Sequence, residues 1–444
     1  MFKLLIKRAS QILFVLLAVP LIYVVIIGQF DETLDPEFTA LYATQPSIPD
    51  HENGFVAFNG LDAPEGEDVI AFGRKMIDHG RKTYLSNDDQ QKAQNGGITF
   101  KGDSSSLKCW ITQDGKEKSQ KEGKPCADAA TVRAMVRDNQ LLLRRYAMLA
   151  HYPHFVQSEF GDPHNGQLII QLQTLLSASM ALNAAEGNAE HALATWLHYA
   201  QMLNHLYTGQ SSYIMQAILM VNRGINLKTL PLILAAMTPQ QIAAHQAALN
   251  AVFDVPAFGP NSWDISATMR AESMILVFAE ENFAKPHQRK DTRGFWERVF
   301  KLYQPNATRN LFTKVSRDTL AFSKLPASSL SEAQKDLDTD YYTRSRWGIH
   351  SLYNGIGKMI MSGILDGSDL VVAAHEQVAV ARLLKLYTAA KIAGIQPKDM
   401  PGFVAATTPD MRDPVTEKPF DWNAQKNSIG YTRPKYNHEF GFVY

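Results

Sequence analysis

The feature that most constrains this chain is an apolar run without charge, residues 12–28, near the N-terminus. With its neighbours it reaches about 20 residues, enough for a helix to cross a ~30 Å hydrocarbon core. Basic residues precede the run and acidic residues follow it: Lys3, Lys7 and Arg8 before, and Asp31, Glu32, Asp35 and Glu37 after. This asymmetry predicts a single-pass inner-membrane helix with a cytoplasmic N-terminus. The body then lies on the far side, which in a bacterium is the periplasm.

A cleaved signal peptide is the alternative interpretation of this segment. Signal peptides have an apolar core of about 7–15 residues, followed by small residues at the cleavage site. Here the apolar run is longer, and residues 27–31 (IGQFD) contain no such pair of small residues. The sequence therefore favours a retained anchor.

The chain contains two cysteines, Cys109 and Cys126. In an oxidising compartment, an even pair at short spacing is typical of a disulfide. The segment between them is polar and rich in lysine, so it has little apolar surface with which to hold a conformation. Two cysteines are too few for a structural zinc site, which has four ligands. The sequence therefore predicts a disulfide that staples this loop.

The remaining sequence predicts an all-α fold, an irregular multi-helix bundle. Alanine, leucine and methionine are frequent, and apolar residues recur at spacings of three and four, the period of an amphipathic helix. In chain order we expect a membrane anchor (1–30), a periplasmic stalk (31–65), a helix with the disulfide-stapled loop (66–126), a helical body (127–399) and an irregular, coiled C-terminal tail (400–444).

Charge and histidine spacing argue against several classes of function. Lysine plus arginine equals aspartate plus glutamate at 44 each, so the balance gives no case for nucleic-acid binding. His191, His198 and His205 repeat every seven residues, about 10.5 Å apart on a helix, which is too far for two of them to chelate one ion. Prolines interrupt the denser cluster around His151 and His154. We therefore expect no metal and no cofactor.

Glu272 is the strongest candidate for a catalytic or ligand-binding side chain. It falls inside an apolar stripe at helical spacing, formed by Ile265, Met269, Leu276, Ala279 and Phe283. A carboxylate buried there must be paired, hydrogen-bonded or protonated, and functional sites collect such groups. A structural ion pair is the alternative, for which the candidate partners are Arg270, Arg344, Arg346 and Arg382.

Several short motifs resemble those of a group of uncharacterised proteobacterial proteins that carry an N-terminal membrane anchor and a helical body. These motifs are NGLDAPEG (59–66), Gly187-Asn188, Arg270-Ala271-Glu272, PNATRN (305–310) and DPVTEKPF (413–420). In the last motif Glu417 stands where glycine is usual, which puts the tight turn in doubt because glutamate resists positive φ. The resemblance implies an inner-membrane-anchored periplasmic helical protein, and it implies no catalytic residues.

These observations favour a membrane-tethered periplasmic protein that binds or scaffolds a partner in the cell envelope. The sequence contains no G-x-S-x-G motif and no complete phosphate-binding loop, so it gives no signature of catalysis. The alternative is an envelope hydrolase, or a lipid- or peptide-binding protein, that uses the buried carboxylate of Glu272 in a helical pocket.

Overall fold

The computed structural model divides the chain into two units. Unit 1 combines residues 1–45, 272–325 and 330–368, and unit 2 combines 46–271, 326–329 and 369–444. The residues that the structure describes are Ile22, Ile26, 29–43, 47–86, 97–112, 126–158, 165–254, 264–284, 303–338, 353–363, 367–433 and 438–444. The predicted anchor lies outside the described residues, apart from Ile22, Ile26, Gln29 and Phe30. The predicted helical body, 127–399, contributes to both units.

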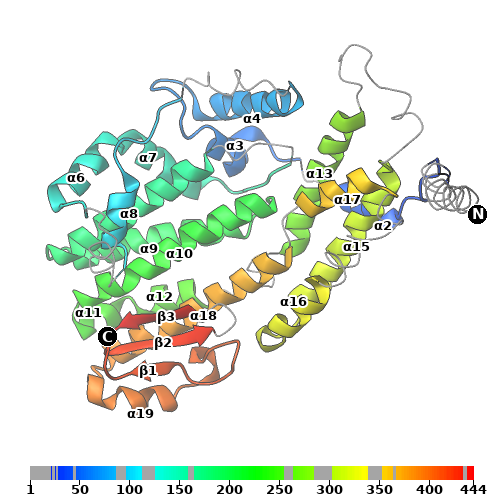
Figure 1. Cartoon of the computed structure of the whole chain (residues 1–444). Coiled ribbons are helices and arrows are strands. Elements are labelled where there is room, and N and C mark those ends of the chain that lie inside the picture. Colours follow the sequence, from blue (N-terminus) through cyan, green and yellow to red (C-terminus); the bar gives the residue numbers. More distant parts are fainter. Residues whose placement is uncertain are drawn as a thin grey trace, which may run out of the picture. The chain divides into compact units, whose positions relative to one another are not determined.

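The described chain is mostly helical, which confirms the predicted all-α character (Figure 1). Unit 2 holds α3 (Gly54–Asn59), α4 (Val69–Ser86), α6 (Ala129–Asp138), α7 (Gln140–Met148), α8 (Gly166–Ala185), α9 (Ala189–Tyr207), α10 (Tyr213–Ala235), α11 (Pro239–Ala244), α12 (Gln246–Phe253), most of α18 (Gly367–Ile392), and α19 (Met400–Ala405). It also holds the 3₁₀ turns η1 (Asp50–Glu52), η3 (Ser104–Trp110), η4 (Leu149–His151), η5 (Ala327–Ser329), η8 (Pro397–Asp399) and η9 (Pro409–Met411).

The core of unit 2 is built on α8, α9 and α10, which run side by side (Figure 1). Helices α8 and α9 form a hairpin, and Gly187 takes a φ of 89° at the turn, a conformation that favours glycine. Among the described helices, α8 and α10 are long and apolar enough to cross a membrane. However, 72% and 61% of their most apolar stretches are buried within the chain, as in the core helices of soluble proteins.

The expected stalk, 31–65, differs from what the structure shows. Residues 54–59 form the buried helix α3 of unit 2. Asn53 accepts a hydrogen bond from Phe55 N at 3.1 Å to cap this helix, and its side chain donates to Val156 O at 2.7 Å. The apolar stretch GFVAF is too short to show a helical period, so the sequence alone suggested only an irregular segment.

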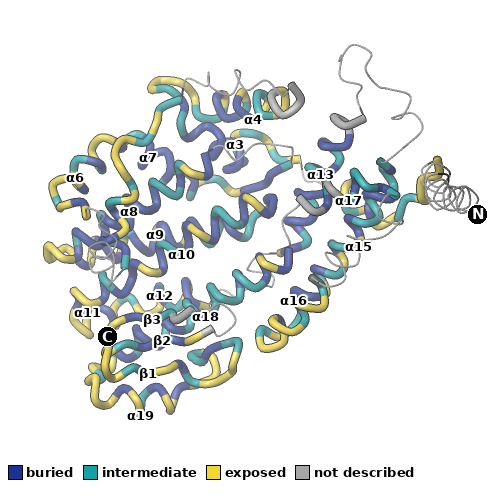
Figure 2. Tube along the Cα trace, in the orientation of Figure 1, coloured by how far each residue is buried: buried dark blue, intermediate teal, exposed yellow. Residues whose placement is uncertain are grey.

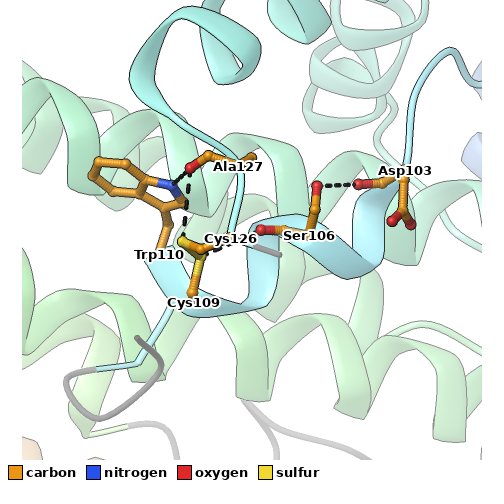
Figure 3. Close-up of a disulfide and its surroundings, with 6 residues drawn as sticks. All are labelled: Asp103, Ser106, Cys109, Trp110, Cys126 and Ala127. Atoms are coloured by element: carbon orange, nitrogen blue, oxygen red, sulfur yellow. Dashed lines mark hydrogen bonds between the residues drawn. A yellow bond between two sulfur atoms is a disulfide. The ribbon is translucent and has the colours of Figure 1, made fainter. Parts of the chain in front are cut away.

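The predicted disulfide between Cys109 and Cys126 is confirmed, with 5.9 Å between the two Cα atoms (Figure 3). It joins η3 to the residues that lead into α6. The indole Nε1 of Trp110 donates to Ala127 O at 2.7 Å beside the bond. Asp128 then caps α6 by accepting from Thr131 N at 2.7 Å. The staple therefore fixes the entry to α6, whereas the loop interior, 113–125, lies outside the described residues.

The predicted coiled tail is in part a small antiparallel sheet, which corrects the sequence analysis. Strands β1 (Asp421–Asn423), β2 (Ser428–Arg433) and β3 (His438–Val443) lie in the order β1-β2-β3 (Figure 1). The rings of Phe442 and Tyr444 contact the buried ring of Tyr387 on α18 edge-on. These aromatic contacts fasten the sheet onto the helices, and the strands are too short to give a clear period in the sequence.

The turn before this sheet is tight although a non-glycine residue, Glu417, stands in it. Glu417 has a φ of 59°, in the left-handed region. Its N–H donates to Asp413 O at 2.8 Å, and Asp413 N donates to Lys418 O at 3.1 Å. Asp413 is buried and also accepts from Thr416 Oγ1 at 2.8 Å. The hydrogen bonds of Asp413 therefore hold a non-glycine residue in a conformation that its Cβ opposes.

Unit 1 holds α2 (Pro36–Ala43), α13 (Ile265–Ala284) from Glu272 onward, α15 (Pro305–Ser323), α16 (Leu330–Asp338) and α17 (Gly355–Gly363). One buried cluster joins four of these helices through Phe38, Leu276, Phe312 and Met361. The ring of Phe38 meets that of Phe312 edge-on, with 6.1 Å between centroids. The core of unit 1 thus includes α2, which the sequence placed in the stalk.

We expect that removing the disulfide destabilises unit 2. In the chain-entropy model, a staple at a sequence separation of 17 contributes roughly 3 kcal/mol to the free energy of unfolding. The double variant Cys109→Ser/Cys126→Ser should therefore unfold at lower urea concentration than the wild-type chain. Reductant should lower the wild-type midpoint similarly and leave that of the double variant unchanged. Equal midpoints for oxidised and reduced wild type would contradict the expectation.

We expect Glu417→Gly to stabilise the fold by about 1 kcal/mol, because glycine adopts a positive φ without a steric penalty. Equilibrium unfolding in urea would measure the gain. Glu417→Ala is the matched control, since it removes the carboxylate but keeps the Cβ atom. An equal gain in the alanine variant would show that charge, and not backbone conformation, is responsible.

Candidate functional site

Glu272 lies on α13 and is buried, with 6% of its surface exposed, as the sequence predicted. Two of its four candidate partners contact other residues. Arg270 donates to Gln210 Oε1 at 3.3 Å, and Arg382 donates to the carbonyl of Arg412 at 3.4 Å. Arg344 and Arg346 lie outside the described residues. A catalytic or ligand-binding role for Glu272 therefore stays a prediction.

A second buried carboxylate, Glu280, lies on the same helix and was missed by the sequence analysis. It is 3% exposed, and its Oε2 accepts from Arg309 Nε and Nη2 at 2.7 Å each. Burial raises the pKa of Glu280, and the hydrogen bonds from Arg309 oppose the rise. The Arg309 guanidinium also lies 5.6 Å from the ring centroid of Phe38. This fork-shaped ion pair joins α13, α15 and α2 inside unit 1.

The pairing between Glu280 and Arg309 is typical of a structural interaction. A buried carboxylate needs an opposite charge nearby, whether or not both of its oxygens accept hydrogen bonds. Here the compensating guanidinium is present and correctly oriented for the carboxylate. The sequence contains one signal for this pair. Arg309 lies in the PNATRN motif, and the residues that follow the motif recur at helical spacing. We therefore assign Glu280 to the stability of unit 1.

Unit 2 contains the opposite situation, a buried cation. Arg223 lies on α10 with 4% of its surface exposed. Its Nη1 donates to Gln377 Oε1 on α18 at 3.0 Å, and its guanidinium lies 5.4 Å from the ring centroid of Tyr207. Burial lowers the pKa of Arg223, and the phenol of Tyr207 acts in the opposite direction. Within the described ranges, no carboxylate pairs with this arginine.

Two donor atoms of Arg223 stand out within this arrangement. Nε and Nη2 are both buried and make no hydrogen bond within the described part of the chain. Gln377 instead uses its amide Nε2 to donate to Met220 O at 2.6 Å, and so links α18 to α10. The sequence signal was present but weak: Arg223 is the only charged residue between Tyr213 and Leu227.

Other polar residues in the core of unit 2 form a hydrogen-bonded network. Gln173 on α8 accepts from Tyr146 OH at 3.1 Å and donates to Asn226 Oδ1 at 3.3 Å. The carbonyl of Asn226 accepts from Trp196 Nε1 at 2.7 Å. Figure 2 shows the buried residues that run along α8, α9 and α10 around this network. These groups pair with one another. Other buried polar groups of unit 2, such as Gln216 and Asn222, have one oxygen without a hydrogen-bond partner, but Arg223 is charged and has two such atoms.

Some histidines and both cysteines of the described residues make other contacts. No group of three or more His, Cys, Asp or Glu among the described residues is placed to hold a metal ion. His205, one of the three regularly spaced histidines, has its Nε2 at 2.8 Å from Tyr152 O. Both cysteines are in the disulfide. What the arrangement around Arg223 can do chemically is hold a negative charge.

Comparison with known proteins adds no identity to this geometry. No family model matches the sequence, and no curated protein or solved structure is significantly similar to it.

We expect Glu280 to give the free energy of unfolding a pH dependence of defined sign. Its raised pKa means that the folded state binds the proton more tightly than the unfolded state. The resulting contribution is fully present below the unfolded pKa of about 4.3 and is lost as pH rises through the folded pKa. In urea titrations from about pH 4 to pH 7, the stability of wild type relative to Glu280→Gln should therefore decrease.

The matched control for this experiment is Glu186→Gln. Glu186 is an exposed carboxylate that pairs with Arg133 in unit 2. The Glu186→Gln variant therefore tests whether the loss of any paired carboxylate gives the same dependence of stability on pH. A wild-type advantage over Glu280→Gln that grows with pH would reverse the expected sign. It would mean that the ion pair with Arg309 outweighs burial.

Proposed function

We propose that this is a membrane-tethered periplasmic protein that binds or scaffolds a partner in the cell envelope. The observation that carries the proposal is an exposed apolar stripe at the N-terminus. Ile22, Ile26 and Phe30 are spaced by four residues and are 56%, 55% and 69% exposed. Large apolar side chains that are exposed are unfavourable in water and favourable in lipid. Their exposure supports insertion of the segment 12–28 into the inner membrane.

The residues directly after this segment support a body held close to the bilayer. Asp31 accepts from the backbone N–H groups of Asn306 and Ala307 at 2.9 and 3.1 Å, at the start of α15. The Asn310 side chain donates to Thr33 O at 2.9 Å. The chain that follows the proposed anchor therefore contacts α15 of unit 1 from Asp31 onward. We infer that unit 1 is the membrane-proximal part.

The disulfide supports the proposed compartment. A bond between Cys109 and Cys126 persists in an oxidising environment such as the periplasm and is rare in the cytosol. This agrees with the charge pattern around residues 12–28 and with the resemblance to anchored proteobacterial proteins. The alternative of a hydrolase, or of a lipid- or peptide-binding protein, depends on Glu272 and is favoured only by the burial of that carboxylate.

We expect the full-length chain, expressed in a Gram-negative host with a C-terminal tag, to stay in the membrane fraction after carbonate extraction. A variant whose residues 1–28 are replaced by a cleavable signal peptide should be soluble in the periplasm. Both forms should carry the oxidised disulfide, since both bodies reach the same compartment. N-terminal sequencing of the full-length protein should recover residues of the anchor. A mature chain that begins after residue 28 would contradict the tether.

The binding half of the proposal is tested in the same strain by photo-crosslinking. A photoreactive residue replaces Tyr42 on α2 of unit 1, which is 42% exposed. The matched control replaces Met148 of unit 2, which is 47% exposed. A discrete adduct from position 42, lost when the anchor is replaced, is expected. No adduct from either position would argue against an envelope partner at these surfaces.

A further inference from the structure

The guanidinium of Arg223 presents an unused edge inside unit 2. Nη1 donates to Gln377, whereas Nε and Nη2 are buried and make no hydrogen bond to the described residues. Nε–H and one N–H of Nη2 point the same way from the planar group. This pair of parallel donors suits a carboxylate. The same two nitrogens of Arg309 both donate to one carboxylate oxygen, Oε2 of Glu280, in unit 1.

The surroundings compensate this charge only in part. Arginine stays protonated even when it is buried, and a buried charge without a counter-charge is strongly unfavourable. Gln377 contributes a neutral amide oxygen, and Tyr207 contributes the face of its ring. The attraction between a cation and an aromatic ring is weaker than the cost of burying an unpaired ion. A negative group at the Nε and Nη2 edge would complete the site.

We infer that Arg223 is a binding site for the carboxylate of an apolar ligand. One unit of negative charge neutralises the single cation, whereas a phosphate dianion would leave a buried excess charge. Leu219 and Leu227 lie one turn to either side of Arg223 on the same face of α10 and are buried. These side chains, with the Tyr207 ring, suit an apolar body attached to the acid. The inference goes beyond the proposed tether and does not depend on it.

Entry of the ligand requires a local opening, because Nε and Nη2 are covered in this structure. Gln377 is the residue that holds α18 on α10 at this point, through Arg223 and through Met220 O. We expect the ligand to enter when these two hydrogen bonds separate. Binding then adds an ion pair at the Nε and Nη2 edge, where the guanidinium has no partner within the described residues.

The test is thermal unfolding of the full-length chain in non-ionic detergent, with sodium butyrate as the probe. Sodium chloride at equal ionic strength, neutral butyramide and inorganic phosphate are the comparison solutes. We expect a saturable rise of the melting temperature with butyrate alone. When the butyrate concentration is ten times the dissociation constant, the ratio of folded to unfolded protein should rise about elevenfold. Arg223→Met should lose this response, because methionine keeps much of the volume but has no donor.

Arg133→Met is the matched control, since Arg133 is an exposed arginine already paired with Glu186. It should keep the butyrate response. If Arg223→Met does not fold, Arg223→Lys keeps the charge without the two parallel donors and should respond less than wild type. No butyrate-specific rise in the wild-type chain would overturn the inference, and so would an undiminished response in both Arg223 variants. An equal rise with phosphate would overturn the assignment to carboxylates.

Discussion

The packing of α10 against α8 and α9 is the constraint on which unit 2 depends. In length and apolarity α10 matches a helix that crosses a membrane, so protein neighbours must cover it in water. Those neighbours also have to satisfy the polar side chains that α10 carries into the core. Asn226 does so through Gln173 and Trp196, one from each adjacent helix. The same packing places Arg223 where water cannot reach its Nε and Nη2 atoms.

Buried charges are compensated differently in the two units. In unit 1 one carboxylate oxygen of Glu280 accepts from both fork nitrogens of Arg309, so the two opposite charges form a complete ion pair within the chain. In unit 2 the cation of Arg223 meets one amide and one aromatic ring. A complete pair needs no ligand, and removing one member leaves an uncompensated charge. This contrast is why we assign the first pair to stability and the second group to binding, although both lie at helix–helix contacts.

Long, periodic segments were predictable from the sequence, and short or non-local features were not. The α8–α9 hairpin and the disulfide follow from local signals: helical period, a glycine at the turn and a pair of cysteines. Helix α3 has six residues, too few for a period, and its burial depends on Asn53, whose partner Val156 is distant in sequence. The β-sheet likewise depends on contacts with Tyr387.

The candidate sites show the same limit. Burial of Glu272 was predictable because an apolar stripe surrounds it on one helix. Glu280 and Arg223 become distinctive only through residues from other helices, Arg309 in the first case and Gln377 in the second. A single charged residue in an apolar helix can lie on the exposed face as readily as on the buried one. Tertiary structure decides which, and that decision is not local in the sequence.

The acidic residues after the apolar run illustrate how one sequence pattern can have two physical causes. We first interpreted them as part of the charge asymmetry that orients a membrane helix, yet acidic residues contribute little to that rule. The structure provides a more specific reason for their presence. Asp31 caps the N-terminus of α15, where the helix dipole favours negative charge, and Asp35 and Glu37 pair with Arg317 on the same helix. The orientation of the proposed anchor therefore depends on Lys3, Lys7 and Arg8, whereas the acidic residues determine where the chain joins unit 1.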